Sequence, residues 1–382
     1  RSHAVSSLLR VLPGALRRNP SPRRPKMAPP IAAVVSLLAA WIAASGAAAV
    51  PTRAHEPSSS TGCAPPTTAM DIVRGRSLDG QVHVVTGGDD GLGYQTALAL
   101  AAANATVVLG CRDAEGKGAD AARRIETATG NSRVAALQVD LSSFDSTRLF
   151  AAQLLLLHPK VHVLVCNAGI PSYRGDQPLT EDGFERVMQV NFLSHFVLVE
   201  HLLPSLRSTH GRVVLVSSDS AIAPCVWGQM PLDCMDIDKL YAAATNTNFS
   251  GLNMFYTQSS NYGLSKYLMV FQAAELARRE PNVSAYAVSL GITKTDLLDK
   301  LEPPVDETIA CFGDPLCPAS PEEGAATSVY LAAASPSELG EGNSGALFGR
   351  CAPMVSVRSI MAAAVGEAKT LEYQSALYDM LL

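Results

Sequence analysis

The sequence predicts an α/β fold, in which one doubly wound and mainly parallel sheet lies between two layers of helices. Two observations lead to this prediction. From residue 78 onward, short apolar runs alternate with helix-like segments, and a glycine-rich turn follows the first apolar run. Such runs are typical of strands buried on both faces, and the helices between them supply right-handed crossovers. A chain of 382 residues that is 47% hydrophobic can bury a core of this kind.

The predicted elements follow one another along the chain. Strands are expected at 82–85, 106–109, 135–139, 161–165, 212–216 and 283–288, and helices at 94–103, 114–128 and 146–157. No internal repeat and no second domain boundary follow residue 78. We therefore expect one three-layer α/β/α domain over 77–382. The tail, 370–382, has helical apolar spacing and is expected to cover the core.

The first 76 residues differ from the rest. An uncharged apolar run at 31–50 ends in small residues, and 52–76, which is rich in Pro, Ser and Thr, is interpreted as a linker. Residues 1–51 have three interpretations: a secretory signal starting at Met27, a membrane anchor, or an organelle transit segment. The leading expectation is the secretory pathway, in the lumen or membrane of the endoplasmic reticulum. A plastid or another organelle is the alternative.

Charge and cysteine usage limit the classes of partner. Residues 1–55 hold eight Lys or Arg and no acidic residue, so removing them from the net charge of −5 leaves −13 for the remainder. An acidic body of this kind repels the phosphate backbone of nucleic acid. The eight cysteines show no zinc-type spacing, so no metal site is predicted. Cys311 and Cys317 are candidates for a disulfide in an oxidising lumen.

The turn after the first predicted strand has the pattern of a dinucleotide-binding loop. It contains Thr86, Gly87, Gly91, Leu92 and Gly93. Gly87 permits a tight turn, Gly91 lets the backbone approach a pyrophosphate, and Gly93 allows the next helix to pack closely with its N-terminus facing the phosphate. Because the turn lies between a predicted strand and a predicted helix, it favours a Rossmann-type fold.

The end of the second predicted strand bears on the choice of cofactor. At Cys111, an NAD-binding protein would be expected to carry a carboxylate for the ribose. The guanidinium of Arg112 suits a 2′-phosphate instead, which favours NADP(H) over NAD(H). Asp89 and Asp90 oppose this preference, since carboxylates repel a phosphate, and Arg112 could also be an ordinary surface charge.

Further cofactor contacts are expected where the next two strands end. Asp140 and Leu141 follow the third strand, and the carboxylate could bind an adenine edge or cap a helix. Asn167, Ala168 and Gly169 follow the fourth strand, and their small size would leave room beside the nucleotide ribose.

Four side chains form a candidate catalytic group. Ser218 follows the fifth strand, and Tyr262 and Lys266 stand four positions apart, which makes them neighbours on a helix. An ammonium nearby would favour the phenolate and lower a tyrosine pKa that is ordinarily about 10, so Tyr262 could act as a base. Ser218 could donate to the substrate oxygen, and Asn191 could hold a water that links Lys266 to solvent. Singly, each feature is more often a surface pair or a strand-end cap.

In combination, these residues resemble the short-chain dehydrogenase/reductase family over roughly 78–382. The motifs that carry the resemblance are Thr86-Gly87-x-x-x-Gly91-x-Gly93, Asn167-Ala168-Gly169, Asn191, Ser218 and Tyr262-x-x-x-Lys266. The stretches 110–113, 180–184, 190–196 and 344–348 are most similar to the retinol dehydrogenase and light-dependent protochlorophyllide reductase branch. The chain departs from it at Leu290-Gly291, where similar proteins carry Pro-Gly, and in a longer segment between Ser218 and Tyr262.

The resemblance implies an NADP(H)-dependent oxidoreductase with a Ser-Tyr-Lys site, which interconverts a small lipophilic alcohol and its aldehyde or ketone. Thr293 completes the expected cofactor-binding set, which also includes Tyr262 and Lys266. The segment 293–317 is expected to cover the substrate. One alternative is reduction of a carbon–carbon double bond, as in protochlorophyllide reduction, and another is an NADP(H)-binding regulator without turnover. Membrane association through the N-terminal apolar segment and a homodimer are both left open by the sequence.

Overall fold

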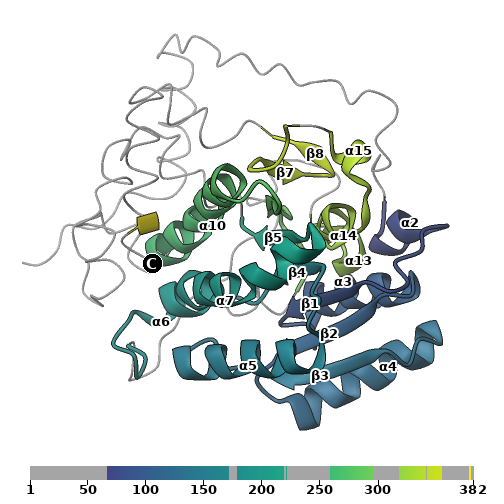
Figure 1. The fold of residues 1–382 in the computed structure, drawn as a ribbon, viewed down its shortest axis with the longest axis horizontal. Coiled ribbons are helices and arrows are strands. Elements are labelled where there is room, and N and C mark those ends of the chain that lie inside the picture. The colour runs from purple at the N-terminus through teal and green to yellow at the C-terminus, as the bar shows by residue number, and fades with distance from the viewer. Residues whose placement is uncertain are drawn as a thin grey trace, which may run out of the picture. The chain divides into compact units, whose positions relative to one another are not determined.

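The structure is a computed structural model, which describes residues 67–171, 179–218, 221, 259–295, 318–340, 342–354 and 378–379 (Figure 1). Several expectations from the sequence lie outside these residues. They are the N-terminal segment 1–51, the first part of the linker, the disulfide between Cys311 and Cys317, and the substrate-covering segment beyond residue 295.

Within the described residues, the strands form one sheet with the order β3-β2-β1-β4-β5-β6-β7-β8. The strands are β1 (Val82–Thr86), β2 (Thr106–Cys111), β3 (Val134–Gln138), β4 (Val163–Cys166), β5 (Arg212–Val216), β6 (Ser284–Ser289), β7 (Leu347–Gly349) and β8 (Ala352–Pro353). All neighbouring strands pair in parallel except β7 and β8, which are antiparallel. The six predicted strands are all present, which confirms the doubly wound sheet.

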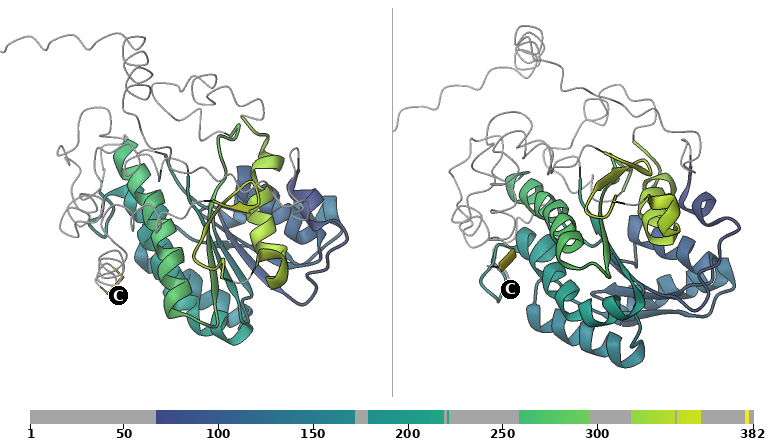
Figure 2. Two further views of the ribbon diagram at one scale, coloured as in Figure 1. Left: turned by 90° about the horizontal axis from the view of Figure 1, so that it is seen from above. Right: turned by 45° about the horizontal axis from the view of Figure 1, so that its top comes forward.

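Helices cover both faces of this sheet (Figures 1 and 2). One face carries α3 (Gly91–Ala102), α4 (Ala119–Thr129) and α14 (Ala326–Ala333), and the other carries α5 (Phe144–Leu157), α7 (Ser194–Thr209) and α10 (Ser259–Arg279). Shorter helices are α2 (Ala69–Val73), α6 (Arg186–Met188), α13 (Pro321–Gly324) and α15 (Pro336–Leu339), and two π-helical turns are η1 (Ala114–Gly118) and η2 (Gln189–Leu193). The three-layer architecture is therefore confirmed.

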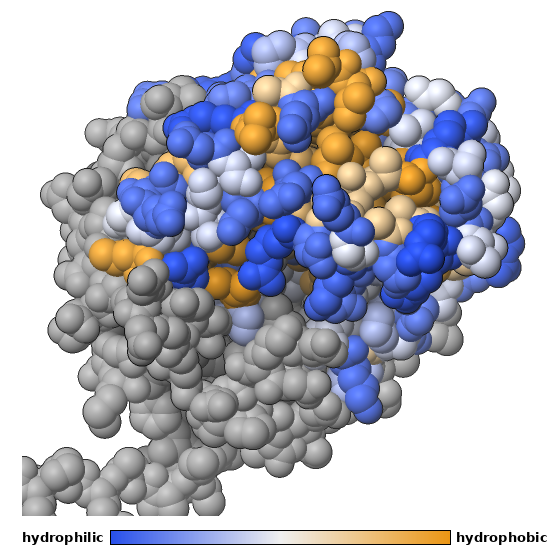
Figure 3. All heavy atoms as spheres, turned by 90° about the horizontal axis from the view of Figure 1, so that it is seen from below, coloured by the Kyte–Doolittle hydropathy of each residue, from blue (hydrophilic) through white to orange (hydrophobic). Residues whose placement is uncertain are grey.

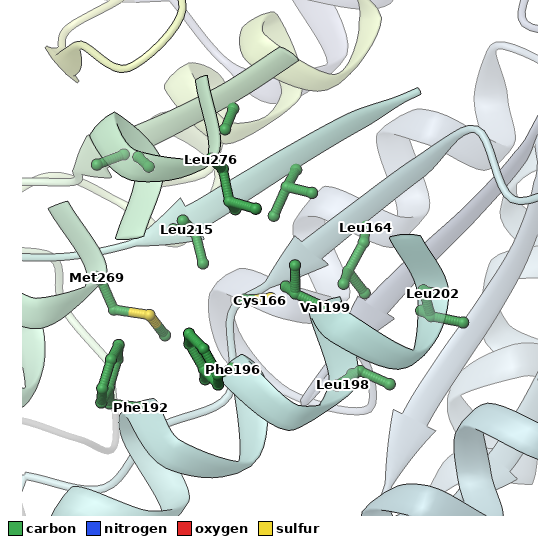
Figure 4. Close-up of a cluster of buried hydrophobic side chains, with 14 of the residues drawn as sticks. Leu164, Cys166, Phe192, Phe196, Leu198, Val199, Leu202, Leu215, Met269 and Leu276 are labelled. Carbon is green, nitrogen blue, oxygen red and sulfur yellow. The ribbon is translucent and has the colours of Figure 1, made fainter. Parts of the chain in front are cut away.

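Each face of the sheet has its own hydrophobic core. On the face covered by α7 and α10, Phe192 and Phe196 pack with Leu215 of β5 and Met269 of α10, and all four side chains are buried (Figure 4). Burying an apolar side chain of this size stabilises the fold by roughly 1.5–3 kcal/mol. This packing holds η2, α7 and α10 against β4 and β5, and these elements carry most of the candidate catalytic residues.

The outer face of α5 carries exposed apolar side chains. Leu149, Leu156 and Leu157 are exposed there, and they make up half of the six exposed large hydrophobic side chains in the described residues. The view from the α5 side shows apolar atoms interspersed with polar ones (Figure 3). Scattered apolar side chains are normal on a protein surface.

The order of the strands creates a crevice at the carboxyl edge of the sheet. β2 and β3 follow β1 on one side, whereas β5 and β6 follow β4 on the other, so the winding reverses between β1 and β4. In open α/β sheets, ligands bind outside the carboxyl ends of the strands at such a reversal. Apart from Tyr262 and Lys266 of α10, the residues predicted to bind the cofactor lie at or just after the carboxyl ends of β1 to β4 and β6.

The interpretation of 52–76 as a linker is wrong for its last part. Residues Ala69–Val73 form α2, and the side chain of Ile72 is buried in the core beneath α14. The guanidinium of Arg76 forms an ion pair with Glu338, with 2.6 Å between Nη2 and Oε1. A helix of five residues is too short for an apolar period to reveal it in the sequence.

Two strands, β7 and β8, are additions that the sequence does not predict. β7 has only three residues, but Leu347 and Phe348 are buried beside β6. The ring of Phe348 meets that of Tyr286 edge to face, with 5.6 Å between centroids. Because these contacts come from distant parts of the chain, no local sequence pattern predicts the strand.

The expectation that the C-terminal tail covers the core is confirmed at Tyr378, which is 4% exposed. Its ring packs edge to face on Phe196, with 5.1 Å between centroids, and its hydroxyl donates a hydrogen bond to Glu200. The next residue, Asp379, pairs with Arg279 at 2.8 Å. These two residues of the tail thereby contact both α7 and α10.

A buried histidine in β1 makes the fold sensitive to acid. His83 is fully buried, its Nε2 contacts Gln81, and its Nδ1 has no hydrogen-bond partner among the described residues. Burial, reinforced by the charge of Arg212, lowers the pKa of His83 to about 3. The folded protein therefore keeps this ring neutral at pH values where an unfolded chain would protonate it.

We predict that stability falls as the pH drops below about 6.5, the ordinary pKa of histidine. Above that pH the His83 ring is neutral in both states and contributes no pH dependence. Between pH 6.5 and about 3, only the unfolded chain protonates this ring, so His83 alone lowers the free energy of unfolding by about 1.4 kcal/mol per pH unit. Urea unfolding at pH 7, 6 and 5 measures this slope. The variant His83→Leu should have a shallower slope, and an unchanged slope would contradict the assignment.

Candidate active site

The glycine-rich turn after β1 packs directly against the residues that follow β4. A Cβ atom on Gly93 would lie 2.0 Å from the carbonyl oxygen of Gly87 and 2.5 Å from Nδ2 of Asn167, so only glycine fits there. Gly91 has a φ of +53°, and a Cβ atom on it would have no neighbour within 4 Å, which leaves open space in front of α3. A close turn beside open space at a helix N-terminus suits a phosphate group.

Asp90 has a structural role in this turn. It is the N-cap of α3, and its carboxylate accepts a hydrogen bond from the backbone N–H of Gly91 at 2.8 Å. A capping carboxylate stabilises a helix N-terminus, which explains an acidic residue beside a candidate phosphate site. The predicted helix at 94–103 therefore begins three residues earlier, at Gly91.

The hydroxyl of Thr86 joins the end of β1 to the end of β4. Its oxygen accepts hydrogen bonds from the backbone N–H groups of Asn167 at 2.9 Å and Ala168 at 3.0 Å. The side-chain amide of Asn167 donates in return to the carbonyl of Thr86 at 2.9 Å. The structure thus brings together Thr86, Gly87, Gly93, Asn167 and Ala168, as the sequence predicts.

Arg112, the residue predicted to bind a 2′-phosphate, directly follows β2. Arg112 is exposed and forms no ion pair with any residue that the structure describes. The carboxylate of Asp113 caps η1 through the N–H groups of Gly116 and Lys117, and these hydrogen bonds lower its pKa. Burial and the charge of Asp89 raise the pKa of the Cys111 thiol to about 12, so Asp89 lies close to this strand end.

Asp140 has one carboxylate oxygen engaged. Its Oδ1 accepts hydrogen bonds from the backbone N–H of Ser142 at 2.8 Å and from the Ser142 hydroxyl at 2.7 Å. The N-cap of α5 is Ser143, so the capping role considered for Asp140 is replaced by a turn within residues 140–142. The carbonyl of the buried Leu141 accepts from the hydroxyl of Ser194 at 2.7 Å.

Reciprocal hydrogen bonds join α10 to the end of β5. The ammonium of Lys266 donates to the carbonyl of Val216 at 2.9 Å, and the hydroxyl of Ser217 donates to the carbonyl of Lys266 at 2.7 Å. Ser218 is the next residue after Ser217. Nζ of Lys266 lies 5.7 Å from the centroid of the Tyr262 ring, as the four-residue spacing predicts. The structure therefore brings Tyr262 and Lys266 together beside the strand end that carries Ser218.

Asn191 lies in η2, where it connects the segment after β4 to α10. Its Oδ1 accepts from the N–H of Ile170 at 2.8 Å, and its Nδ2 donates to the carbonyl of Ile170 and to the hydroxyl of Ser265, each at 3.0 Å. A Cβ on Gly169 would lie 3.2 Å from Oδ1 of Asn191 and 3.3 Å from Nζ of Lys266. Both amide protons of Asn191 are used, so its predicted role in holding a water stays a prediction.

Burial sets the protonation of the groups around Lys266. Its side chain is 3% exposed, and desolvation lowers its pKa to about 8. The fully buried thiol of Cys166 has its pKa raised by burial, and the charge of Lys266 partly offsets this effect. At neutral pH the site therefore holds a cation beside a neutral thiol, and a cation there would favour the phenolate form of Tyr262.

The loop after β6 is held by the segment that precedes α13. The backbone N–H of Lys294 donates to the carbonyl of Ala319 at 2.9 Å, and Thr293 is buried. A Cβ on Gly324 of α13 would lie 2.6 Å from Thr293 and 2.9 Å from Leu92. Thr293 and Leu92, both predicted to bind the cofactor, thus meet across one glycine at the start of α3.

Two residues with positioning hydroxyls are not predicted from the sequence. Ser217 and Ser265 hold Lys266 and Asn191 in place. Both stand next to residues that the motifs single out, so a position within a motif is the one signal that could have found them. The direction of a hydroxyl hydrogen bond is set by tertiary contacts and not by sequence spacing.

A family model described as short chain dehydrogenase matches residues 81–230. Human retinol dehydrogenase 14 is 34% identical over 298 residues, which cover 72% of this chain and 79% of that protein. The chicken WW domain-containing oxidoreductase is 43% identical over 154 residues, which cover 40% of this chain but only 36% of that protein. The match thus spans little more than a third of that relative's length.

Solved structures show the same fold. A short chain dehydrogenase/reductase family protein is 26% identical, with a TM-score of 0.51, and the alignment covers 72% of this chain and 96% of that one. The NADPH-dependent 3-quinuclidinone reductase of Rhodotorula rubra is 20% identical, with a TM-score of 0.53, over 74% of this chain and 93% of that one.

Proposed function

The chain belongs to the short-chain dehydrogenase family of oxidoreductases, and on this basis we propose that it is an NADP(H)-dependent enzyme that interconverts a lipophilic alcohol and its aldehyde or ketone. The observation that carries the proposal is the buried ammonium of Lys266 beside the ring of Tyr262, at the strand end that bears Ser218. The name of the relative retinol dehydrogenase 14 supports a lipophilic alcohol as the substrate class.

In the proposed reaction, Tyr262 exchanges a proton with the substrate oxygen. The ammonium of Lys266 stabilises the phenolate, so that Tyr262 accepts the hydroxyl proton of an alcohol and returns it when a carbonyl is reduced. The hydroxyl of Ser218 donates to the same oxygen and stabilises the charge that develops on it. A bound nicotinamide supplies or accepts the hydride.

The described residues suit NADP(H). The glycines of the turn and the N-terminus of α3 would hold the pyrophosphate, and Arg112 would pair with a 2′-phosphate. Because Asp113 is occupied as a cap, it is not free to bind a ribose in place of the phosphate. The second carboxylate oxygen of Asp140 would accept from the adenine amino group. Asp89 remains an opposing charge near Cys111.

Disulfide bonding supports a location in an oxidising compartment. Cys351 is disulfide-bonded, whereas Cys111 and Cys166 are free and buried, so neither of them is its partner. Disulfides persist in the secretory pathway and are rare in the cytosol. Among the residues described, no helix is long and apolar enough to cross a bilayer. We propose the lumen of the secretory pathway as the site of folding.

We predict that Tyr262→Phe lowers kcat about 10²- to 10⁴-fold, since it removes the group that transfers the proton. The dissociation constant for NADPH should stay within about twofold of the wild type. Turnover is followed by NADPH absorbance with retinoids, steroids and fatty aldehydes, and binding by calorimetry. A variant with wild-type turnover would refute the catalytic assignment. A wild-type protein that binds NADPH without turning over any substrate would favour the regulator.

We predict that the wild type prefers NADPH to NADH and that Arg112→Ala removes this preference. Loss of a charge-assisted hydrogen bond should weaken NADPH binding about 10- to 100-fold and leave NADH nearly unchanged. The matched control is Arg123→Ala, since Arg123 is also exposed but pairs with Asp120 within α4. Equal affinity of the wild type for the two cofactors would overturn the NADP(H) proposal.

We predict that Cys351 of the secreted or luminal protein resists alkylation in denaturant until a reductant is added. Cys111 and Cys166 should be alkylated in denaturant alone, because they are buried but free. Peptide mapping by mass spectrometry, with and without the reductant, measures all three. Alkylation of Cys351 without a reductant would contradict the disulfide and remove this support for the compartment.

A further inference from the structure

His195 lies at the start of α7 and is completely buried between the cofactor turn and Asn191. Its Nε2 is 2.9 Å from the hydroxyl oxygen of Thr86, and its Nδ1 is 2.9 Å from the backbone carbonyl oxygen of Asn191. The proposed reaction gives this ring no role. It nevertheless contacts the strand end at the cofactor turn and the residue that holds the segment after β4.

The partners of the ring determine where its proton lies. A carbonyl oxygen can only accept, so the Asn191 contact requires a proton on Nδ1. In the neutral ring Nε2 is then an acceptor, and the Thr86 hydroxyl donates to it. That hydroxyl oxygen already accepts from the N–H groups of Asn167 and Ala168, so its one proton and its two lone pairs are all used.

The ring is also held neutral. Burial, together with the nearby charge of Lys266, lowers the pKa of His195 to about 4. A protonated ring would present an N–H to Thr86, whose proton would have to turn to the carbonyl of Val165 at the longer distance of 3.4 Å. The neutral ring with its proton on Nδ1 therefore satisfies every donor and acceptor around it.

The hydrogen bonds continue in one direction from His195 to the catalytic helix. Asn191 donates through Nδ2 to the hydroxyl of Ser265 at 3.0 Å, and that hydroxyl donates to the backbone carbonyl of Tyr262 at 2.7 Å. The path thus runs from the residues after β4 through Thr86, His195 and Asn191 to Tyr262. Each group in it donates to the next.

We propose that His195, with its proton on Nδ1, is a positioning residue that sets the distance between the cofactor turn and Asn191, and through Asn191 the position of Tyr262. This inference rests on the proposed function. The bond to Thr86 holds the cofactor side of the site, and the bond to Asn191 holds the catalytic side. Losing one or the other should therefore affect different steps.

The tautomer is tested directly by long-range ¹H–¹⁵N correlation NMR on protein labelled at histidine, with the His195 signals assigned by their loss in His195→Gln. We expect Nδ1 to be protonated and Nε2 to be bare. In water the opposite tautomer prevails for free histidine, so a proton on Nε2 of His195, or on both nitrogens at pH 7, would overturn the inference. This measurement needs no turnover and is informative even if the proposed function fails.

Two variants separate the two bonds. In His195→Gln the side-chain oxygen can still accept from Thr86 near the place of Nε2, so NADPH affinity should stay within about twofold while kcat falls about tenfold. In His195→Asn the amide can still donate to Asn191 near the place of Nδ1, so the dissociation constant for NADPH should rise about tenfold. Equal effects of both variants on both constants would indicate a merely structural role and overturn the inference.

His201 provides a matched control on the same helix. Its Nδ1 also contacts a carbonyl four residues earlier, that of Val197, but the side chain is exposed. His201→Asn should leave both constants unchanged. If the variants at 195 do not fold, the tautomer of the wild-type ring, measured by NMR, remains the test, and a proton on Nε2 would overturn the inference.

Discussion

A buried cation is strongly unfavourable unless its protons are hydrogen-bonded, and this constraint governs the centre of the molecule. Lys266 meets part of it by donating one of its three protons to the carbonyl of Val216, and Ser217 donates a hydrogen bond to the backbone carbonyl of Lys266. The end of β5 and the middle of α10 are thereby held at one point. Ser218 and Tyr262 flank that point, so their relative position depends on keeping the ammonium satisfied.

The parts of the fold that the sequence predicts are those with a local pattern. The strands at 82–86 and 212–216 are mainly apolar, and because their ends can be located in the sequence, the residues that follow them can be assigned to the carboxyl edge. The same holds for Tyr262 and Lys266, whose spacing makes them helical neighbours. In this chain, periodicity and motif spacing are enough to predict where the candidate site lies.

The features that the sequence does not reveal depend on distant contacts. β7 is a strand only because β6 and Tyr286 lie beside it, and α2 is a helix too short to show a period. The bond between Thr86 and His195 spans 109 residues, and nothing in the spacing of the two residues indicates it. The charge of Asp90 by itself argues against a phosphate site, but in the structure its carboxylate is the N-cap of α3.

The ion pair between Arg76 and Glu338 joins residues 262 positions apart, one just after α2 and the other in α15. On a ribosome, Arg76 has left the exit tunnel long before Glu338 is made. The apolar face of α2 therefore remains uncovered through most of synthesis, because α14, which covers it, spans Ala326–Ala333. Closure of this side of the domain is a late event, and a nascent chain stalled before residue 338 would expose that apolar surface to chaperones and to other unfinished chains.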